Sequence, residues 1–461
     1  MKIKIVGAAG GEVTGSSYLI ETANAKVMVD AGMFQGGRNT EEKNRLPEGT
    51  DPKILDALLL THAHLDHTGR IPLLLKNGFK NTIYATDATI DLAEIVLKDS
   101  AKIQEQDAAR KNRYHPERHV EPLYTPNDTL SFRSQCQTVE LHQHIPVADG
   151  ITARFFEAGH MLGSTSIELT VHEKGKTHVV VFSGDLGPID QPILRPFEQL
   201  PHADLVFMES TYGNRDHRPY NETIKEFEEI ILKAVESKGK ILIPAFAIGR
   251  TQQILYHLAI LFVQKKVRHF PVFVDSPMAI RAGKVFAEHP DLFDEEATDW
   301  KRQGLLPLDR NWFQFCVSME ESKQLNSIEG PCVILAGAGM CNAGRIQHHL
   351  KFNLPHQETQ VLIVGYQGSG SLGRQLVDGA TQVKIHGETI PVRAQIHTLN
   401  GFSAHAGQSD LLKWFSSLGQ MKPKVVLTHG ENLQRETLAD QIEKKYGLKP
   451  LLPELNETVE I

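Results

Sequence analysis

The stretch Thr61-His62-Ala63-His64-Leu65-Asp66-His67 places three histidines and one aspartate within six positions. It follows directly on the apolar run at residues 57–60, which is typical of a buried β-strand. A strand that ends in such a cluster brings several metal ligands to one edge of a sheet. Imidazole nitrogen and carboxylate oxygen are ligands that zinc accepts in an open catalytic site. The stretch therefore predicts a metal-activated water molecule and, with it, a hydrolase.

The composition indicates a globular protein of two or three domains without a membrane span. Of the 461 residues, 41% are hydrophobic and 23% charged, and no apolar run approaches the length of a membrane-crossing helix. The N-terminus predicts a strand and not a signal peptide. The four cysteines show no Cys-x-x-Cys spacing, so we expect reduced thiols and a cytoplasmic location. The net charge of −7 excludes a basic protein that coats nucleic acid, but it leaves a local basic groove open.

The N-terminal part of the chain alternates short strands with loops and contains two helices. Runs rich in Val and Ile that end in Gly, Asp or His predict strands at residues 3–6, 17–20, 26–29, 57–60, 82–84, 151–156, 166–171 and 178–182. Helices are expected at residues 71–76 and 88–112. Because strands and helices do not alternate regularly, a mixed sheet or a sandwich is favoured.

Beyond Thr211 the pattern changes to a regular alternation of strands and helices. Helices are expected at residues 221–236, 251–262 and after Pro277, and strands at residues 241–243, 272–274, 333–335 and 361–364. This alternation predicts a parallel sheet with helices on both faces. From residue 389 onwards strands return, with a helix at 409–416 and a strand at 425–428. One domain inserted into another is the simplest organisation.

Three further strand ends carry candidate metal ligands. His160, Asp185 and His429 each follow an apolar strand and lie beside a glycine. A single histidine or aspartate in such a place is more often structural. Three of them in matching contexts, together with the His-x-His-x-Asp-His cluster, reverse that expectation and predict one metal centre.

These residues together resemble the metallo-β-lactamase superfamily, whose signature is His-x-His-x-Asp-His. The resemblance implies an α/β fold, an αββα sandwich that holds two zinc ions. One ion is expected to take His62, His64 and His160, and the other Asp66, His67 and His429, with Asp185 bridging both. Asp30, in Val29-Asp30-Ala31-Gly32, matches the early strand-end aspartate of the family and is expected to orient ligands or the attacking water.

The middle of the chain resembles the β-CASP branch of this superfamily. Glu209 in Glu209-Ser210-Thr211-Tyr212-Gly213, His405 in Ser403-Ala404-His405-Ala406 and His429 match its three extra motifs. The resemblance implies a sandwich core at residues 1–208 and 389–461, with an inserted parallel α/β (β-CASP) domain at residues 209–388. A histidine in the third motif is typical of members that cut RNA. The chain is similar to ribonucleases of the cleavage and polyadenylation endonuclease type.

The resemblance implies a zinc-dependent, mainly endonucleolytic ribonuclease that acts on single-stranded RNA. Two cations hold a water molecule as hydroxide and neutralise charge on the scissile phosphate, and zinc lowers the pKa of its bound water to roughly 7. His405 is expected to protonate the leaving ribose oxygen, with Glu209 keeping it cationic. Asp66 is expected to be catalytic as well as a ligand. The expected product carries a 5′-phosphate.

Possible RNA contacts are weaker predictions. Arg250, Ser371, Arg374 and Ser403 lie in turns or helix starts that suit a phosphate group. The run from Gly368 to Gly373 matches Gly-x-Gly-x-x-Gly, but its place deep in the chain argues against a nicotinamide cofactor. Tyr212 and Phe402 flank the motifs, and either base stacking or core packing suits them.

Two alternatives stay open. The first is a small-molecule metallo-hydrolase of the same superfamily, such as a thioesterase or lactonase, although a small substrate needs no inserted domain. The second is a non-catalytic RNA-processing scaffold, although every expected ligand is present in this chain. RNA is the expected partner, a membrane partner is not expected, and a homodimer is an expectation that comes from the family alone.

Overall fold

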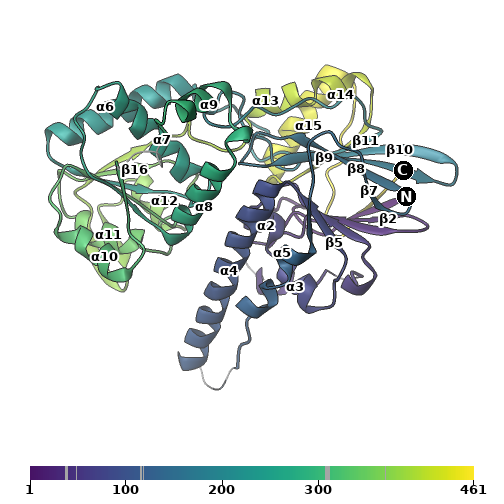
Figure 1. Cartoon of the computed structure of the whole chain (residues 1–461), viewed down its shortest axis with the longest axis horizontal. Helices are drawn as coiled ribbons and strands as arrows, with labels where there is room; N and C mark the ends of the chain where they lie inside the picture. The colour runs from purple at the N-terminus through teal and green to yellow at the C-terminus, as the bar shows by residue number, and fades with distance from the viewer. Residues whose placement is uncertain (37–39, 48, 115–116, 118, 307–311, 369) are drawn as a thin grey trace. The chain divides into compact units, whose positions relative to one another are not determined.

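The computed structural model describes residues 1–36, 40–47, 49–114, 117, 119–306, 312–368 and 370–461. They form two compact units (Figure 1). Unit 1 comprises Met1–Ile189, Arg195–Asp216 and His405–Ile461, and unit 2 comprises Asp190–Leu194 and His217–Ala404. The chain thus enters unit 2 and returns to unit 1. The limits of the predicted insertion, residues 209 and 388, stay a prediction.

Unit 1 contains two mixed β-sheets. The first has the strand order β21-β1-β2-β3-β4-β5-β6, in which β21 to β3 pair antiparallel and β3 to β6 pair parallel. Its strands are β1 (Lys2–Ile5), β2 (Tyr18–Glu21), β3 (Lys26–Val29), β4 (Ala57–Leu59), β5 (Thr82–Ala85), β6 (Cys136–Thr138) and β21 (Thr458–Glu460). The carboxyl ends of parallel neighbours meet at one edge, and the His-x-His-x-Asp-His stretch follows β4 there.

The second sheet of unit 1 has the order β20-β11-β10-β9-β8-β7. The four strands from β7 to β10 are antiparallel, whereas β10, β11 and β20 are parallel. The strands are β7 (Ile145–Ala148), β8 (Ile151–Glu157), β9 (Thr165–Glu173), β10 (Lys176–Phe182), β11 (Leu205–Glu209) and β20 (Lys424–Thr428). Alternate residues of both sheets, among them Val27, Leu59, Phe155, Leu169 and Phe207, share one buried cluster. Burial of this apolar surface holds the two sheets face to face.

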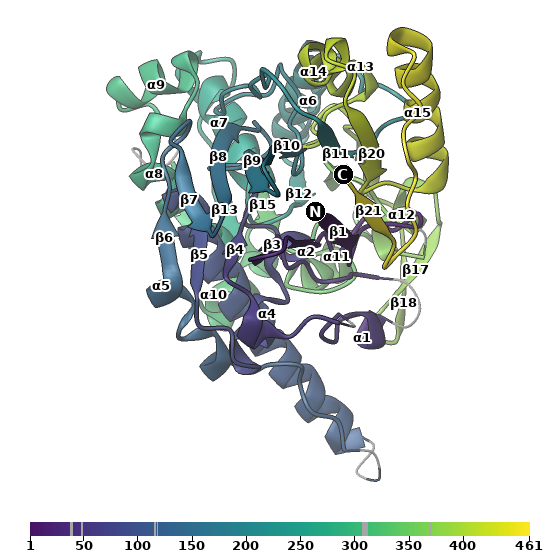
Figure 2. The same ribbon diagram turned by 90° about the vertical axis from the view of Figure 1, so that its right-hand side faces the viewer.

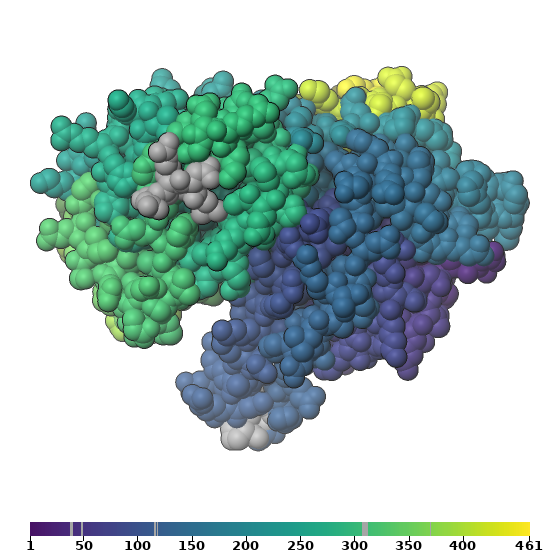
Figure 3. Space-filling model, viewed as in Figure 1, coloured from purple at the N-terminus to yellow at the C-terminus, as the bar shows by residue number. Residues whose placement is uncertain are grey.

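Helices cover the outer faces of this sandwich. Next to the second sheet, Val206 and Leu427 pack with Trp414 and Leu438 of the C-terminal helices α13 (Gln408–Trp414), α14 (Ser416–Gln420) and α15 (Asn432–Tyr446), which lie beside β11 and β20 (Figure 2). The helices α1 (Thr40–Lys43), α2 (Leu65–Thr68), α3 (Ile71–Lys76), α4 (Asp87–Tyr114) and α5 (Phe132–Gln135) belong to the other side. The C-terminal half of α4 stands away from the rest of unit 1 (Figure 3). These layers make unit 1 an αββα sandwich.

Unit 2 is built on a six-stranded parallel sheet of order β14-β13-β15-β12-β16-β19. Its strands are β12 (Lys240–Pro244), β13 (Val272–Asp275), β14 (Phe313–Phe315), β15 (Cys332–Ala336), β16 (Gln360–Ile363) and β19 (Gln395–Thr398). Along β15, Val333 and Leu335 pack into one buried cluster while Ile334 packs into another on the opposite face. Both faces are therefore apolar, as a parallel sheet between helices requires.

The helices of unit 2 lie on both faces of its sheet (Figure 1). Phe227 of α6 and Leu258 of α7 belong to the first buried cluster, and Leu350 of α11 and Leu376 of α12 belong to the second. The helices are α6 (Tyr220–Glu236), α7 (Arg250–Val263), α8 (Pro277–Glu288), α9 (Glu295–Arg302), α10 (Met319–Gln324), α11 (Ile346–Asn353) and α12 (Leu372–Val377), and a small hairpin joins β17 (Gln382–Ile385) to β18 (Glu388–Pro391).

The predicted α/β fold class is confirmed, and the eight strands predicted in the N-terminal part each lie within two residues of an observed strand. The helix predicted at 409–416 corresponds to α13, and a second short helix, α14, follows directly after Phe415. Among the strands of unit 1, the sequence did not predict β6, β7, β11 and β21. Two of these span only three residues, which is too short for a recognisable alternation. Among the described residues, no helix has the length and apolar character that a membrane crossing requires.

Candidate metal centre

The first candidate ligands lie in the turn between β4 and α2. His62 follows the buried strand, His64 has an extended backbone directly before the helix, and Asp66 and His67 occupy its first turns. The neighbouring loop after β3 passes very close to this turn, since a Cβ atom at Gly32 would lie 1.7 Å from the carbonyl oxygen of Asp66. Only glycine permits this approach.

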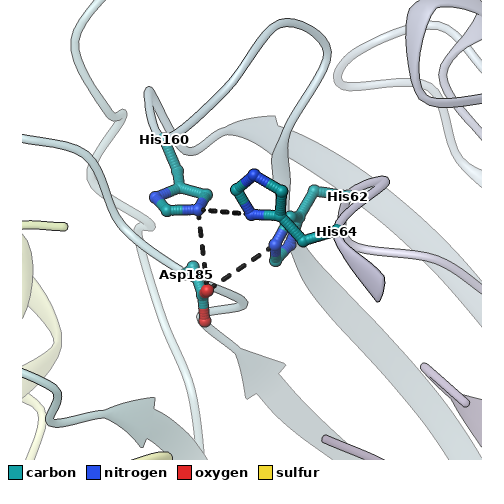
Figure 4. A group of neighbouring side chains, drawn as sticks. All are labelled: His62, His64, His160 and Asp185. Atoms are coloured by element: carbon teal, nitrogen blue, oxygen red, sulfur yellow. Dashed lines mark hydrogen bonds and ion pairs between the residues drawn. The ribbon is translucent and has the colours of Figure 1, made fainter. Parts of the chain in front are cut away.

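Four side chains from three loops form the first ligand group (Figure 4). Nε2 of His160, in the loop after β8, lies 3.0 Å from Nδ1 of His64. Oδ2 of Asp185, in the loop after β10, lies 3.6 Å from Nε2 of His62 and 3.6 Å from Nε2 of His160. The potential ligand atoms of these four residues all lie within 4.8 Å of one another.

A second ligand group adjoins the first. It consists of Asp66, His67 and His429, the last of which follows β20. Nε2 of His67 lies 3.3 Å from Nε2 of His429, and Nε2 of His429 lies 3.5 Å from Oδ2 of Asp66. Oδ1 of Asp185 faces this group, at 3.2 Å from Nε2 of His67 and 3.6 Å from Nε2 of His429. The two oxygens of one carboxylate therefore face two different sets of histidines.

The donor set fits divalent cations. Nε2 of His62 and Oδ1 of Asp185 are buried and make no hydrogen bond to any described residue, which is costly unless a cation satisfies them. Burial, followed by the positive charge of neighbouring histidines, lowers the pKa of His62 well below its ordinary value. His62 is thus neutral, the form in which imidazole binds a metal. Although burial raises the pKa of Asp185, the surrounding histidines lower it well below its ordinary value, so it is ionised.

Residues behind the two groups orient the imidazole rings. Oδ2 of Asp30 accepts hydrogen bonds of 2.7 Å from Nδ1 of His67 and 2.7 Å from Oγ1 of Thr61, and Oδ1 accepts one of 2.8 Å from the amide of Thr61. Because a carboxylate only accepts, Nδ1 of His67 carries a proton, and Nε2 is the ring atom that faces the second ligand group. On the other side, Oγ1 of Thr211 lies 3.1 Å from Nδ1 of His429.

Glu209 and His405 form a third group beside the centre. Oε1 of Glu209, at the end of β11, lies 3.4 Å from Nδ1 of His405 and accepts a 2.7 Å hydrogen bond from the amide of Leu186. Nδ1 of His405 is 3.9 Å from Oδ2 of Asp185. Burial lowers the pKa of His405, but the Glu209 carboxylate outweighs this and raises the pKa to about 9. His405 therefore holds a proton at neutral pH next to the ligand groups.

The four residues predicted to contact RNA phosphate belong to unit 2 and not to this centre. Arg250 is buried, hydrogen-bonded to Gln253, and stacked over Phe402 at 5.7 Å. The hydroxyl of Ser371 is buried and accepts a 3.0 Å hydrogen bond from the amide of Arg374 at the start of α12.

Arg374 is exposed and forms an ion pair of 2.5 Å with Asp378, while Ser403 is half-buried. Phe402 is fully buried in the core of unit 2, so the base-stacking alternative for it is wrong and the core-packing alternative holds. Ser369, in the predicted glycine-rich turn, lies outside the described residues. The phosphate contacts therefore stay a prediction.

Sequence reasoning missed Thr61 and Thr211, which hold the rings or their partners in place. Thr61 lies between the end of β4 and His62, and Thr211 lies two residues after Glu209, the last residue of β11. A threonine in that position is too common a residue to single out without the fold.

Comparison with known proteins places the chain in a family. Residues 10–245 match the metallo-beta-lactamase superfamily, residues 251–376 match the Beta-Casp domain, and residues 389–453 match the RNA specificity domain of Zn-dependent metallo-hydrolases.

The chain is 41% identical to "Ribonuclease TTHA0252" of Thermus thermophilus over 94% of this chain and 93% of that protein. It is 29% identical to "Transcription termination factor FttA" of Pyrococcus abyssi over 100% of this chain and 71% of that protein. A crystal structure of a protein of unknown function from Enterococcus faecalis V583 shares the fold, with a TM-score of 0.56 and 13% identity over 100% of this chain and 99% of that one. The chain therefore belongs to the metallo-β-lactamase superfamily and, within it, to the β-CASP family of metal-dependent hydrolases.

Proposed function

We propose that this protein is a cytoplasmic endoribonuclease that hydrolyses phosphodiester bonds of single-stranded RNA with two zinc ions. The observation that carries the proposal is the position of Asp185, whose two oxygens face two separate sets of histidines. The relative from Thermus thermophilus is named a ribonuclease, and residues 389–453 match an RNA specificity domain. Both support RNA as the substrate.

The seven side chains of the two groups would hold the ions. His62, His64 and His160 would bind one ion, Asp66, His67 and His429 the other, and Asp185 would bridge them. Nitrogen and oxygen donors of this kind suit zinc with an open coordination position. When bound, the ions supply a hydroxide nucleophile near neutral pH and neutralise charge on the phosphate.

Residues of the chain complete the reaction. The leaving 3′ oxygen of the ribose needs a proton when the P–O bond breaks, and His405 carries one at neutral pH. Glu209 holds the ring of His405 through Nδ1, which leaves Nε2 of His405 as the atom that donates this proton. Asp66 would help to hold the second ion and thereby serve the reaction. The products are a 5′-phosphate on the downstream fragment and a 3′-hydroxyl on the upstream fragment.

The test is product-end analysis on a long single-stranded RNA labelled at either end. The zinc-loaded protein should yield internal fragments with 5′-phosphate ends, and Asp185→Asn should not cleave. A small thioester and a lactone are assayed in parallel. Turnover of either without RNA cleavage would identify a small-molecule hydrolase, and RNA binding without any turnover would identify a scaffold. Either result would refute the proposal.

A further inference from the structure

The side chain of Phe246 lies in a position that packing within unit 2 does not explain. It follows β12, a central strand of the parallel sheet, and yet is 48% exposed. In open parallel sheets, ligands bind beyond the carboxyl ends of the strands, which is where Phe246 lies.

Two glycines support one edge of this ring. Gly339 follows β15 and Gly365 follows β16, the two strands that flank β12. A Cβ atom at Gly339 would lie 3.0 Å from both Cδ2 and Cε2 of Phe246, and one at Gly365 would lie 3.7 Å from Cε2. The ring therefore rests against backbone on its Cδ2–Cε2 edge.

Hydrogen bonds hold the ring and its support in place. Nε2 of the buried Gln367 donates to the carbonyl oxygen of Gly339 at 2.9 Å and to that of Gly365 at 3.1 Å. The carbonyl oxygen of Phe246 accepts from Oγ1 of Thr251 at 2.8 Å and from its amide at 3.3 Å. Phe246 is thus an exposed aromatic ring on a backbone that is fixed from both sides, so little ordering entropy is lost when a flat group binds.

We propose that Phe246 is a stacking platform for an unpaired base of the RNA, which rests on the ribonuclease function proposed above. Every base has a flat π-face, so an aromatic platform binds single-stranded RNA without sequence preference. Tyr366, next to Gly365, is 56% exposed and offers a second ring on the adjoining loop. Among the residues of unit 2 that the structure describes, the other large exposed apolar side chains lie on other segments, namely Phe315, Val317, Met319 and Phe352. One or two exposed rings among glycines suit a base better than they suit a protein partner, which needs a contiguous apolar patch.

The test compares cleavage of one single-stranded RNA by Phe246→Ala, Phe246→Trp and the control Phe352→Ala, whose side chain is 51% exposed on α11. Loss of one stacked base should raise KM about 5- to 100-fold in Phe246→Ala, with the melting temperature unchanged. Phe246→Trp should restore KM, and Phe352→Ala should match the wild type. Gly339→Ala keeps the ring but forces it to move by a few tenths of an ångström, and should raise KM less than Phe246→Ala.

RNAs with a single abasic position, moved one nucleotide at a time, locate the stacked base. The wild type should show one position at which the abasic site raises KM, and Phe246→Ala should have lost that sensitivity. An unchanged KM in Phe246→Ala would overturn the platform, and so would equal sensitivity of the wild type and Phe246→Ala to the abasic position. RNA cleavage by the wild type would still support the ribonuclease function. A change of oligomeric state in Phe246→Ala with an unchanged KM would assign the ring to a contact between copies and also overturn it. If the wild type neither binds nor cleaves RNA, both proposals fail.

Discussion

Oε1 of Glu209 lies 3.4 Å from Nδ1 of His405, although the two residues are 196 positions apart in the chain. The buried carboxylate raises the pKa of His405 to about 9 against the effect of burial. Leu186 links the two: its amide donates to Oε1 of Glu209 at 2.7 Å, and its carbonyl oxygen accepts from the amide of Ala406, next to His405, at 2.7 Å. The pair places a proton donor beside the ligand groups.

Replacement of His405 should separate proton donation from metal binding. His405→Ala is expected to lower kcat on RNA about 10²- to 10⁴-fold, because the leaving oxygen loses its general acid. Metal content, measured by mass spectrometry of the purified protein, should stay at the wild-type level. Wild-type kcat in this variant would refute the role of His405.

Glu209→Gln should shift the pH dependence of kcat. The carboxylate raises the pKa of His405, so its removal should lower that pKa. Since the alkaline limb of the profile reports deprotonation of the acid, this limb should move to lower pH in the variant. If kcat of Glu209→Gln is lower at every pH but its alkaline limb stays at the wild-type pH, Glu209 does not set the pKa of His405.

Asp30→Asn should weaken metal binding without unfolding the protein. Asp30 accepts a 2.7 Å hydrogen bond from His67, and groups of this kind typically contribute 10- to 100-fold to metal affinity. Asparagine also tolerates the backbone φ of 56° at this position. Competition with a zinc-sensitive chelator measures the affinity. Asp107→Asn, on the exposed part of α4, is the control that should behave like the wild type.

Metal removal should destabilise unit 1. Zinc at one hundred times its dissociation constant adds about 2.7 kcal/mol to the free energy of unfolding. We expect EDTA to increase hydrogen exchange at residues 61–67 and around Asp185, and zinc to reverse it. Asp185→Asn should lose at least one of the two proposed ions and respond less to EDTA. Equal exchange with and without EDTA would show that these side chains do not hold a metal.

Glu157 should make stability fall as the pH rises. Burial raises the pKa of Glu157 from 4.5 to about 7 in the folded protein. Below pH 4.5 the Glu157 carboxyl is protonated in both the folded and the unfolded protein, so it does not change the free energy of unfolding with pH. Between pH 4.5 and 7 only the folded protein keeps this proton, so the free energy of unfolding falls as the pH rises.

Glu157→Gln should therefore raise the free energy of unfolding by about 3 kcal/mol above pH 7 and change it little at pH 4. Glutamine can still accept the 2.9 Å hydrogen bond from the amide of Gly159. Chemical denaturation at the two pH values measures the difference, and the exposed Glu140→Gln is the control. A stabilisation that is equal at both pH values would contradict the raised pKa.

Much of the ligand set could be predicted because its members follow a local rule. His62 to His67 lie within one turn after β4, and His160, Asp185 and His429 each follow a strand next to a glycine. The carboxyl ends of neighbouring parallel strands lie at the same edge of a sheet. Candidate ligands that each follow a strand in the sequence are therefore predicted to lie close together in space. Glu209 and His405 have no such local signal, and only the family resemblance singled them out.

Other features depend on contacts that no local pattern encodes. Arg250 was a candidate for contact with RNA phosphate, and base stacking or core packing was open for Phe402, but the fold of unit 2 buries both side chains. Phe246 was not singled out at all, since its exposure depends on glycines in two loops far along the chain. Whether a side chain is exposed depends on which residues, often distant in the sequence, pack around it in the folded protein.

The resemblance to the metallo-β-lactamase superfamily implied the αββα sandwich. The sequence by itself determined the chemistry of the centre: nitrogen and oxygen donors and their strand-end positions. These follow from residue type and short spacings, which covalent geometry keeps in any fold. Only the tertiary structure decided that the two oxygens of Asp185 face different histidine sets, that Asp30 binds Nδ1 of His67, and that Phe246 stays exposed. These relations depend on how two sheets and their loops pack, and long-range packing sets distances that spacing along the chain leaves open.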